Sequence, residues 1–193
     1  MPTSELADEL RKYVGRVQKV RLSRQTPCAP SLNGFILALG EVWLLLWQFH
    51  DFYPDGFTLI RVDGICECRC GKYEEFWTNM LQEEQIVHEL PDPKIDISSE
   101  QTILTCLQKT QENFIVESED PDDDTEDFYL GRAVRIQKSG IKFASFDGLG
   151  KWGAKLHSIG YDEITRIQFD TPYANSFSRY TDGDCPFPIR VAE

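Results

Sequence analysis

The chain has no hydrophobic run long enough to cross a membrane as a helix. Such a span needs about 20 consecutive apolar residues, whereas the longest apolar run here covers only residues 42–47. The first eight residues lack the basic and apolar regions of a secretory signal peptide. The spacing of the six cysteines is not that of a small disulfide-bonded domain, so we expect free thiols. These absences favour a cytoplasmic protein without a membrane partner.

Motifs of catalysis and of phosphate binding are also missing. No Gly-x-Ser-x-Gly sequence surrounds a nucleophile, and none of the three histidines lies beside one. Gly148 and Gly150 lack the third glycine of a dinucleotide-binding loop. His50, Asp51 and Asp55 could form an acid–base group, but we expect them to line a turn. The sequence therefore predicts a non-catalytic protein that needs no cofactor.

What the sequence does contain is an internal repeat. Residues 34–49 align with residues 131–146 without a gap, and a two-residue insertion then aligns residues 63–65 with residues 162–164. Self-similarity at a long offset indicates that one structural unit is built twice. We therefore predict a tandem duplication.

Each repeat is predicted to contain a helix followed by about five short strands. In the first repeat we expect a helix over 3–13, a strand or further helix over 15–22, strands over 35–39, 43–49, 57–62 and 65–70, a turn at 53–56 and a helix over 72–82. In the second repeat we expect a helix over 98–111 and strands over 113–118, 128–136, 141–146, 154–159 and 164–169. Short, closely spaced strands suggest a small closed or strongly bent antiparallel barrel. The proline-containing linker at residues 90–93 divides the chain into units 1–90 and 91–193.

The run Ile60-Arg61-Val62-Asp63-Gly64-Ile65 resembles the second sequence motif of Sm and Lsm proteins. Members of that family have an N-terminal helix and five bent strands, and place Arg-Gly-Asp (or Asn) at the turn between the last two strands. Residues 159–164 are a fainter echo of the motif. The resemblance implies a tandem pair of Sm-like, SH3-like small β-barrels that are mainly β with flanking helices. It also implies an RNA site in which Arg61 and Asp63 hold a base.

A basic stretch near the N-terminus could add to such an RNA site. Arg16, Lys19 and Arg21 belong to a run of six basic residues between positions 11 and 24 that contains no acidic residue. Contacts between such side chains and phosphates make binding salt-dependent. The net charge of −12 opposes binding to a polyanion, so nucleic acid is the alternative partner.

Three cysteines alternate along one predicted strand, at positions Cys66, Cys68 and Cys70. Alternate residues of a strand point to one face, so the three thiols could bind zinc or copper(I) with His50 or Cys28 as a fourth ligand. Free cysteine also behaves as a small hydrophobic residue. Their counterparts in the second repeat are residues that fill a core: Thr165, Ile167 and Phe169. We therefore predict that the three cysteines pack in the core, with metal binding as the alternative.

Much of the negative charge is local, because eight acidic residues lie within residues 117–127. Asp122, Asp123 and Asp124 are adjacent rather than alternate, and the pattern of a calcium-binding EF-hand loop is missing. We expect a solvated loop. It suggests a further possibility, an acidic inhibitor or immunity-type protein that masks a basic partner.

Aromatic residues at helical spacing end each repeat: Tyr73 and Trp77 in the first, Tyr173 and Phe177 in the second. An exposed aromatic patch marks a protein interface, and we expect these four side chains to pack one unit against the other. Since no catalytic or metal-binding group stands out, the sequence favours an interaction or adaptor protein whose partner is another protein. RNA binding and the masking of a basic partner are the alternatives.

Overall fold

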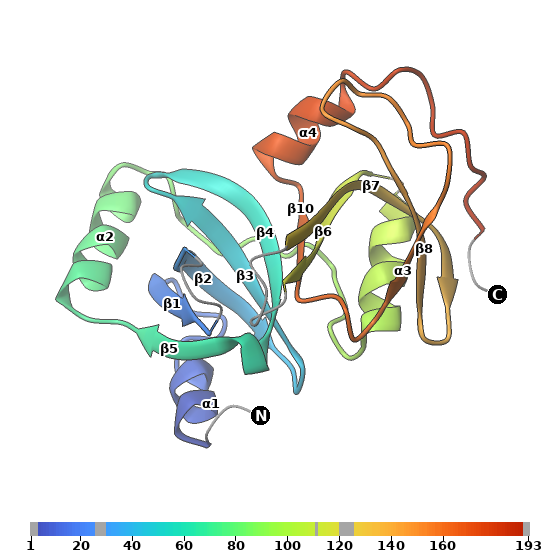
Figure 1. Cartoon of the computed structure of the whole chain (residues 1–193). Coiled ribbons are helices and arrows are strands. Elements are labelled where there is room, and N and C mark those ends of the chain that lie inside the picture. The colour runs from blue at the N-terminus through green and yellow to red at the C-terminus, as the bar shows by residue number, and fades with distance from the viewer. Residues whose placement is uncertain (1–3, 26–29, 111, 120–125, 191–193) are drawn as a thin grey trace. The chain divides into compact units, whose positions relative to one another are not determined.

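The computed structural model describes residues 4–25, 30–110, 112–119 and 126–190 (Figure 1). The chain divides into two compact units, Met1–Pro93 and Lys94–Glu193. Both units are mainly β with flanking helices. Within the described ranges, no helix combines the length and the hydrophobicity that a membrane span requires.

The first unit is an antiparallel five-stranded sheet with a helix at each end of its sequence. Its elements are α1 (Ser4–Arg11), β1 (Val20–Arg24), β2 (Leu32–Leu39), β3 (Trp43–His50), β4 (Tyr53–Arg61), the 3-10 helix η1 (Val62–Gly64), β5 (Ile65–Arg69) and α2 (Lys72–Glu83). The strands lie in the order β5-β1-β2-β3-β4, so the last strand of the unit pairs with its first.

Hydrophobic residues cover both faces of this sheet. Alternation along β2 sends Ile36 into a cluster that also holds Leu10 of α1. The neighbouring residue, Phe35, joins a second cluster with Leu81 of α2. The helices α1 and α2 therefore pack on different hydrophobic clusters of the sheet, and the face under α2 carries the candidate site.

The turn predicted at residues 53–56 is wrong, because these residues belong to β4. The chain turns at residues 51 and 52, where Asp51 has a φ of 52°. Pro54 lies opposite Phe49, and the register then shifts before position 47. Gly56, with a φ of 81°, lies in this irregularity. The Pro-Asp-Gly sequence thus lies in a β-bulge rather than in the turn itself. A bulge, like a turn, can require a positive φ, which glycine adopts readily.

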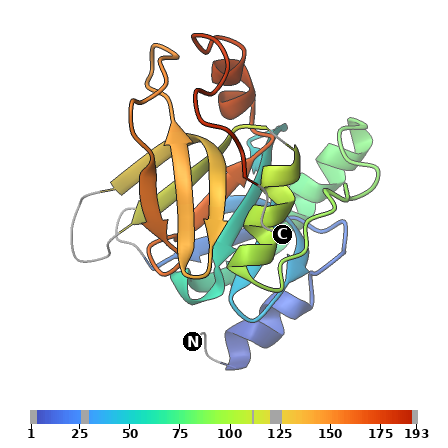
Figure 2. The same cartoon turned by 90° about the vertical axis from the view of Figure 1, so that its right-hand side faces the viewer.

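The second unit repeats this arrangement with different lengths. Its elements are α3 (Glu100–Thr110), β6 (Phe114–Glu119), β7 (Glu126–Gln137), β8 (Gly140–Ser145), β9 (His157–Gly160), β10 (Arg166–Phe169) and α4 (Pro172–Ser178). The strand order is β10-β6-β7-β8-β9, again with the last strand beside the first. Figure 2 shows α3 lying along the strands of this unit, where Gln108 Nε2 donates a hydrogen bond to the Ala133 carbonyl at 3.1 Å.

The strand registers of the two units agree position by position. Gly34 lies opposite Gln48 in the first unit, and Gly131 lies opposite Ser145 in the second. Both hairpins then shift register two residues further on, after Ile36 and after Ala133. A Cβ atom at either glycine would collide with a carbonyl oxygen of the facing strand. The two hairpins therefore share the same close backbone contact and the same bulge.

Candidate ligand-binding pockets

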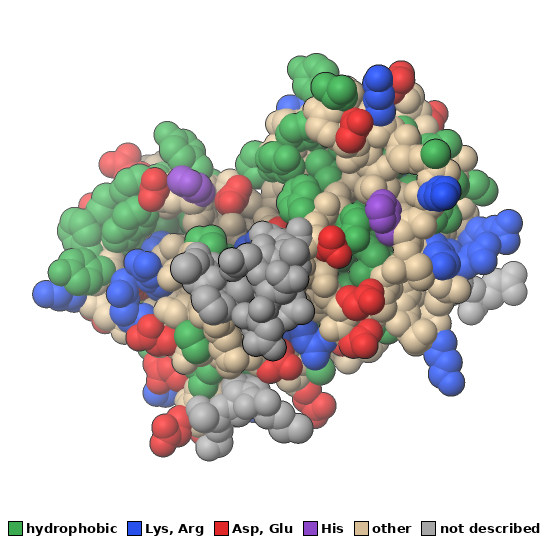
Figure 3. All heavy atoms as spheres, viewed as in Figure 1, with side chains coloured by type: hydrophobic (Ala, Val, Ile, Leu, Met, Phe, Trp, Pro, Cys, Tyr) green, Lys and Arg blue, Asp and Glu red, His purple; other side chains and the backbone are tan. Residues whose placement is uncertain are grey.

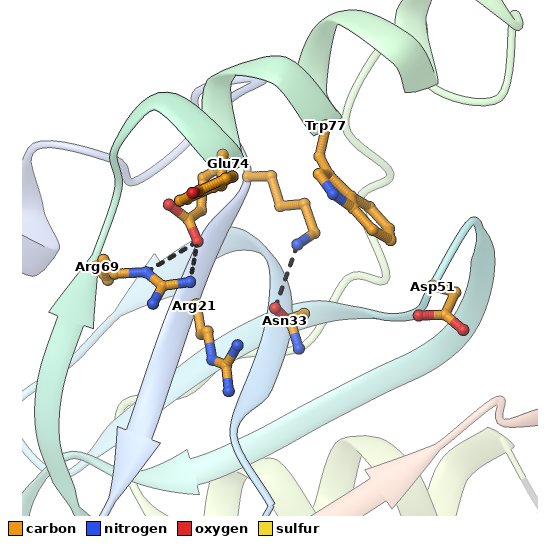
Figure 4. A pocket seen from close by; sticks show the side chains of 8 residues that line it. Arg21, Asn33, Asp51, Arg69, Glu74 and Trp77 are labelled. Carbon is orange, nitrogen blue, oxygen red and sulfur yellow. Dashed lines mark hydrogen bonds and ion pairs between the residues drawn. The ribbon is translucent and has the colours of Figure 1, made fainter.

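A pocket of about 310 Å³ lies under α2 in the first unit (Figure 4). Residues of β1, β2, β5, α2 and the β3–β4 turn surround it. We call it the basic pocket, and it is lined by Lys19, Arg21, Asn33, Asp51, Arg69, Tyr73, Glu74 and Trp77. Three of these side chains are basic and two are acidic, in a chain whose net charge is −12. Basic side chains thus outnumber acidic ones by one in this pocket, although the protein as a whole is acidic.

A buried threonine fixes α2 above the pocket. Thr78 Oγ1 accepts a hydrogen bond from the backbone N–H of Lys19 at 3.0 Å. The same hydroxyl donates to the carbonyl oxygen of Glu74, one turn earlier in α2, at 2.8 Å. Lys19 directly precedes β1, so this contact ties the helix to the start of the strand that carries the basic side chains.

Lys19 is the most unusual residue of the pocket, because its side chain is only 5% exposed. Its Nζ donates a hydrogen bond to Asn33 Oδ1 at 3.2 Å and lies 4.6 Å from the ring centroid of Trp77. Phe52, from the β3–β4 turn, stacks on Trp77 with ring centroids 4.6 Å apart. Burial lowers the pKa of Lys19, and the nearby Arg21 adds to this effect. The pocket therefore holds a desolvated ammonium group beside an indole ring.

Glu74 and Arg69 form an ion pair at the edge of the pocket. Glu74 is 3% exposed, and its Oε1 accepts from Arg69 Nη2 at 2.7 Å and from Arg69 Nε at 3.0 Å. Its Oε2 accepts from the Gly71 N–H at 2.9 Å, at the start of α2. Burial raises the pKa of Glu74, but the hydrogen bonds from Arg69 and Gly71 outweigh it and hold the pKa below the ordinary value. Both carboxylate oxygens are thus engaged.

The second unit has a pocket at the matching place, under α4. We call it the aromatic pocket. It has a volume of about 250 Å³ and is lined by Phe128, Leu130, Ser145, Phe146, Asp147, Gly148, Tyr173 and Phe177. Tyr173 contacts Phe177 at a centroid distance of 4.7 Å and meets Phe128 edge-on at 6.0 Å. Asp147 Oδ1 accepts from the N–H groups of Leu149 and Lys151. These backbone hydrogen bonds lower the pKa of Asp147 and shape the turn at the pocket.

The four aromatic residues expected at an interface all line these pockets. Tyr73 and Trp77 line the basic pocket, and Tyr173 and Phe177 line the aromatic pocket. The two tyrosines are 64% and 51% exposed, and Figure 3 shows hydrophobic side chains gathered at the surface over α2 and over α4. Trp77 and Phe177 each contact a ring of their own unit. That the four residues pack one unit against the other stays a prediction.

The residues expected to bind RNA do not come together. Arg61 and Asp63 lie just before β5 and contact each other, with 3.3 Å between Arg61 Nε and Asp63 Oδ1. Lys19 and Arg21 lie in the basic pocket, which Arg69 borders at the other end of β5. Arg16 is exposed and lines neither pocket. The predicted RNA site is therefore divided between the two ends of a strand.

The predicted burial of the three cysteines in the core is wrong for Cys66. Cys68 and Cys70 are partly buried against the first cluster, whereas Cys66 is exposed and donates to the Arg24 carbonyl at 3.4 Å. The cause is a bulge: β1 pairs with the residues on either side of Cys66 but not with Cys66 itself. Burial raises the pKa of Cys68 to about 12, which disfavours the thiolate that binds metals. No cluster of three metal-ligating side chains exists among the described residues, and Cys28 lies outside them.

The prediction of a solvated loop over residues 117–127 is wrong at the N-terminal end of this acidic run. Glu117 is a buried residue of β6, and its carboxylate accepts hydrogen bonds from Arg166 Nε and from Gln168 Nε2 on β10. A buried carboxylate requires such partners. Asp122, Asp123 and Asp124 lie outside the described residues.

One pair of potentially reactive side chains was not expected from the sequence. Ser145 Oγ and His157 Nε2 lie 2.9 Å apart across β8 and β9, and the His157 ring contacts Tyr129. In the described part of the chain, no carboxylate hydrogen-bonds to His157, so the orienting group of a catalytic triad is missing there. Asp55, expected near His50 and Asp51, instead accepts a hydrogen bond from Gln48. A serine and a histidine twelve positions apart form no sequence motif. Only the pairing of β8 with β9 brings the two side chains together.

The two pockets differ in what they can bind. The basic pocket offers cationic donors beside an indole and a phenol ring, a combination that suits an anionic group attached to an apolar one. The aromatic pocket offers mainly ring surfaces, which suit an apolar side chain. Comparison of the chain with family models, with curated proteins and with solved structures finds no match.

Proposed function

We propose that this chain is a non-catalytic interaction or adaptor protein that binds another protein through the two pockets. The observation that carries the proposal is the exposure of Tyr73 and Tyr173 at matching helical positions. Each tyrosine stands at the mouth of a pocket whose wall includes the aromatic residue four positions later in the same helix. Tyrosine is enriched at protein interfaces because it buries a large ring and keeps a polar end.

We further propose that each unit is a small Sm-like barrel and that the two arose by duplication. Support comes from the shared strand order, in which the last strand pairs with the first. Further support comes from the matching registers and bulges of β2 with β3 and of β7 with β8. Duplication of a binding unit creates two sites in one chain, and linked sites raise the overall affinity for a partner that spans both.

Site-specific photo-crosslinking tests the protein-binding function. A photoreactive phenylalanine analogue replaces Tyr73 or Tyr173 in the full chain, which is expressed in its source cells. We expect each variant to crosslink to a discrete protein. Tyr53 and Tyr180 are matched controls, because they are 76% and 77% exposed and line neither pocket. Equal crosslinking from the control positions, or crosslinks to nucleic acid alone, would contradict the proposal.

RNA binding is the second candidate function, favoured by the combination of Lys19 and Arg21 with the exposed ring of Tyr73. Aromatic rings stack on RNA bases while basic side chains contact the phosphates. The test is binding of mixed single-stranded RNA at low and at moderate salt. Absence of binding at low salt removes this candidate.

A further inference from the structure

The basic pocket contains an ammonium group that is only partly satisfied by the protein. The Nζ of Lys19 makes one side-chain hydrogen bond within the described part of the chain, to Asn33 Oδ1 at 3.2 Å. An ammonium group has three N–H donors. Lys19 is only 5% exposed and lines the pocket, so the remaining donors are available to a ligand that enters the pocket. A buried cation of this kind favours an anionic ligand.

The two carboxylates of the pocket, Glu74 and Asp51, offset only part of the charge of its three basic side chains. Glu74 directs Oε1 to Arg69 and Oε2 to the backbone of Gly71. Asp51 belongs to the β3–β4 turn, and Figure 4 shows it apart from the labelled basic side chains. Its Oδ2 lies 3.8 Å from His50 Nδ1. Positive charge is therefore left over inside the pocket.

Arg21 adds a second cationic donor to the same space. It follows Lys19 by two residues at the start of β1, which places both on one side of the strand. Arg21 is directly opposite Arg69 of β5, whose guanidinium is held by Glu74. The Arg21 side chain is exposed and makes no hydrogen bond to any residue that the structure describes. Its planar fork is suited to a carboxylate or phosphate.

We propose that the basic pocket binds an oxyanion carried by a peptide segment of a partner protein, between Lys19 Nζ and the Arg21 guanidinium. The oxyanion is a carboxylate or a phosphate group, and the adjoining part of the peptide lies against Trp77 and Tyr73. The inference rests on the protein-binding function proposed above and specifies what one of the two pockets recognises.

The size and charge of the surroundings favour a single oxyanion on a peptide over a nucleic acid. A volume of about 310 Å³ is at the small end of ligand pockets and accommodates one side chain. A nucleic acid would bring many phosphates to a chain with a net charge of −12. A lone anionic side chain meets only the local positive charge.

The aromatic pocket provides an internal comparison. Its lining contains no lysine, arginine or histidine, and its one charged residue is Asp147. An oxyanion therefore has a binding partner only in the first of the two pockets. We expect the affinity of the aromatic pocket for a peptide not to increase when the peptide carries an oxyanion.

Calorimetric titration of the full chain with a matched set of peptides tests the inference. The probes are a hexapeptide with acetylated and amidated ends and a single glutamate, the same peptide with phosphoserine at that position, and the same peptide with glutamine. Backbone-amide NMR locates the bound peptide. We expect the two anionic peptides to bind at least tenfold more tightly than the glutamine peptide, with shifts confined to β1, the end of β5 and α2. The stronger of the two identifies the oxyanion.

Two variants separate recognition from folding. Lys19→Met and Arg21→Glu are each expected to weaken the anionic peptides at least tenfold and to leave the glutamine peptide unchanged. Arg21 is exposed, so its replacement keeps the test valid if Lys19→Met does not fold. Arg16→Gln is the matched control, since it removes an exposed positive charge outside the pocket.

Two results would overturn the inference. One is equal affinity of all three peptides for the natural chain. The other is tighter binding of an oligouridylate that Arg21→Glu abolishes, which would assign the pocket to RNA. Crosslinking from Tyr173 probes the aromatic pocket and does not depend on the binding of an oxyanion. The protein-binding function and this inference can therefore fail separately.

Discussion

The two units build the same backbone frame around pockets of opposite character. In the first unit, Lys19 occupies the position that Asn113 holds in the second, and each contacts the final helix of its unit. Lys19 reaches toward Asn33, whereas Asn113 Oδ1 accepts from Arg132 Nε at 2.9 Å. The contact between sheet and helix is therefore retained while the charge at that position changes.

The comparison extends to the edge where the first and last strands pair. Ser23 lies opposite Glu67 in the first unit, at the position where Glu117 lies opposite Arg166 in the second. The first pair is an exposed hydrogen bond of 3.0 Å, and the second is an ion pair in which Glu117 is buried and Arg166 is partly buried. Matching registers thus allow each pair of side chains to be tested against its counterpart.

The largest expected difference between the units concerns these edge pairs. Glu117→Ala leaves the partly buried Arg166 without its carboxylate partner, and we expect a loss of about 3 kcal/mol in the unfolding free energy of the second unit. Ser23→Ala removes only an exposed hydrogen bond and should cost less than about 1 kcal/mol. Hydrogen exchange resolved by peptide, in increasing urea, measures both units in one sample. Losses of similar size in the two units would show that the ion pair stabilises its unit no more than the exposed hydrogen bond does.

The shared glycines should behave alike rather than differently. Gly34→Ala and Gly131→Ala each force a Cβ against the facing backbone, and we expect a loss of about 1–3 kcal/mol in either unit. Gly148→Ala is the control, since no heavy atom lies within 4 Å of its added Cβ. Urea midpoints of the three variants provide the measurement. A strong effect at one of the paired glycines only would break the equivalence of the two hairpins.

The position shared by Lys19 and Asn113 should give effects of opposite sign. Lys19→Met removes a buried charge and keeps the apolar stem, so we expect a gain of about 1 kcal/mol at neutral pH. Asn113→Ala removes the hydrogen bonds that the buried Asn113 side chain makes with Arg132 and Ser178 and should cost about 1–2 kcal/mol.

The sign of the lysine effect has a pH dependence that can be checked by thermal melts. Because the folded-state pKa of Lys19 is lowered below 10.5, the cost of its charge is present at neutral pH. That cost begins to fall as the pH passes the folded-state pKa and is gone above the unfolded value of 10.5, so the advantage of Lys19→Met should shrink at alkaline pH. A constant advantage at all pH values would mean that the charge is not its cause.

The smallest expected effect is the acid sensitivity of the first unit. The pKa of Glu74 is lowered from 4.5 in the folded state, so its carboxylate favours folding above that value. This contribution is lost as the pH falls through the folded-state pKa. Glu74→Gln should flatten that part of the stability–pH curve, measured by circular dichroism between neutral and acid pH. An unchanged curve would assign the acid sensitivity to other groups.

The order and type of the regular elements were largely predictable because hydrophobic alternation is a local signal. The strands near residues 35–39 and 43–49 and the helix near 72–82 appear within a few residues of their predicted limits. The bulges were not predictable, since a bulge depends on pairing with another strand. That is why the turn at 53–56 and the burial of Cys66 were wrong.

The pocket was predictable only in part. Lys19 and Arg21 stood out as charges, and Tyr73 and Trp77 as aromatic residues with helical spacing. Their meeting depends on the antiparallel pairing of β1 with β5 and on the contact between Thr78 and Lys19. Both are long-range contacts of the folded chain.

The bulge in β5 has a consequence for thiol chemistry. It leaves the sulfur of Cys66 open to alkylating reagents and to oxidants, which reach only accessible thiols. Two residues later, Cys68 has a pKa of about 12 and stays protonated at physiological pH. One unpaired residue in a strand thus separates an accessible thiol from a partly buried one whose raised pKa disfavours the reactive thiolate.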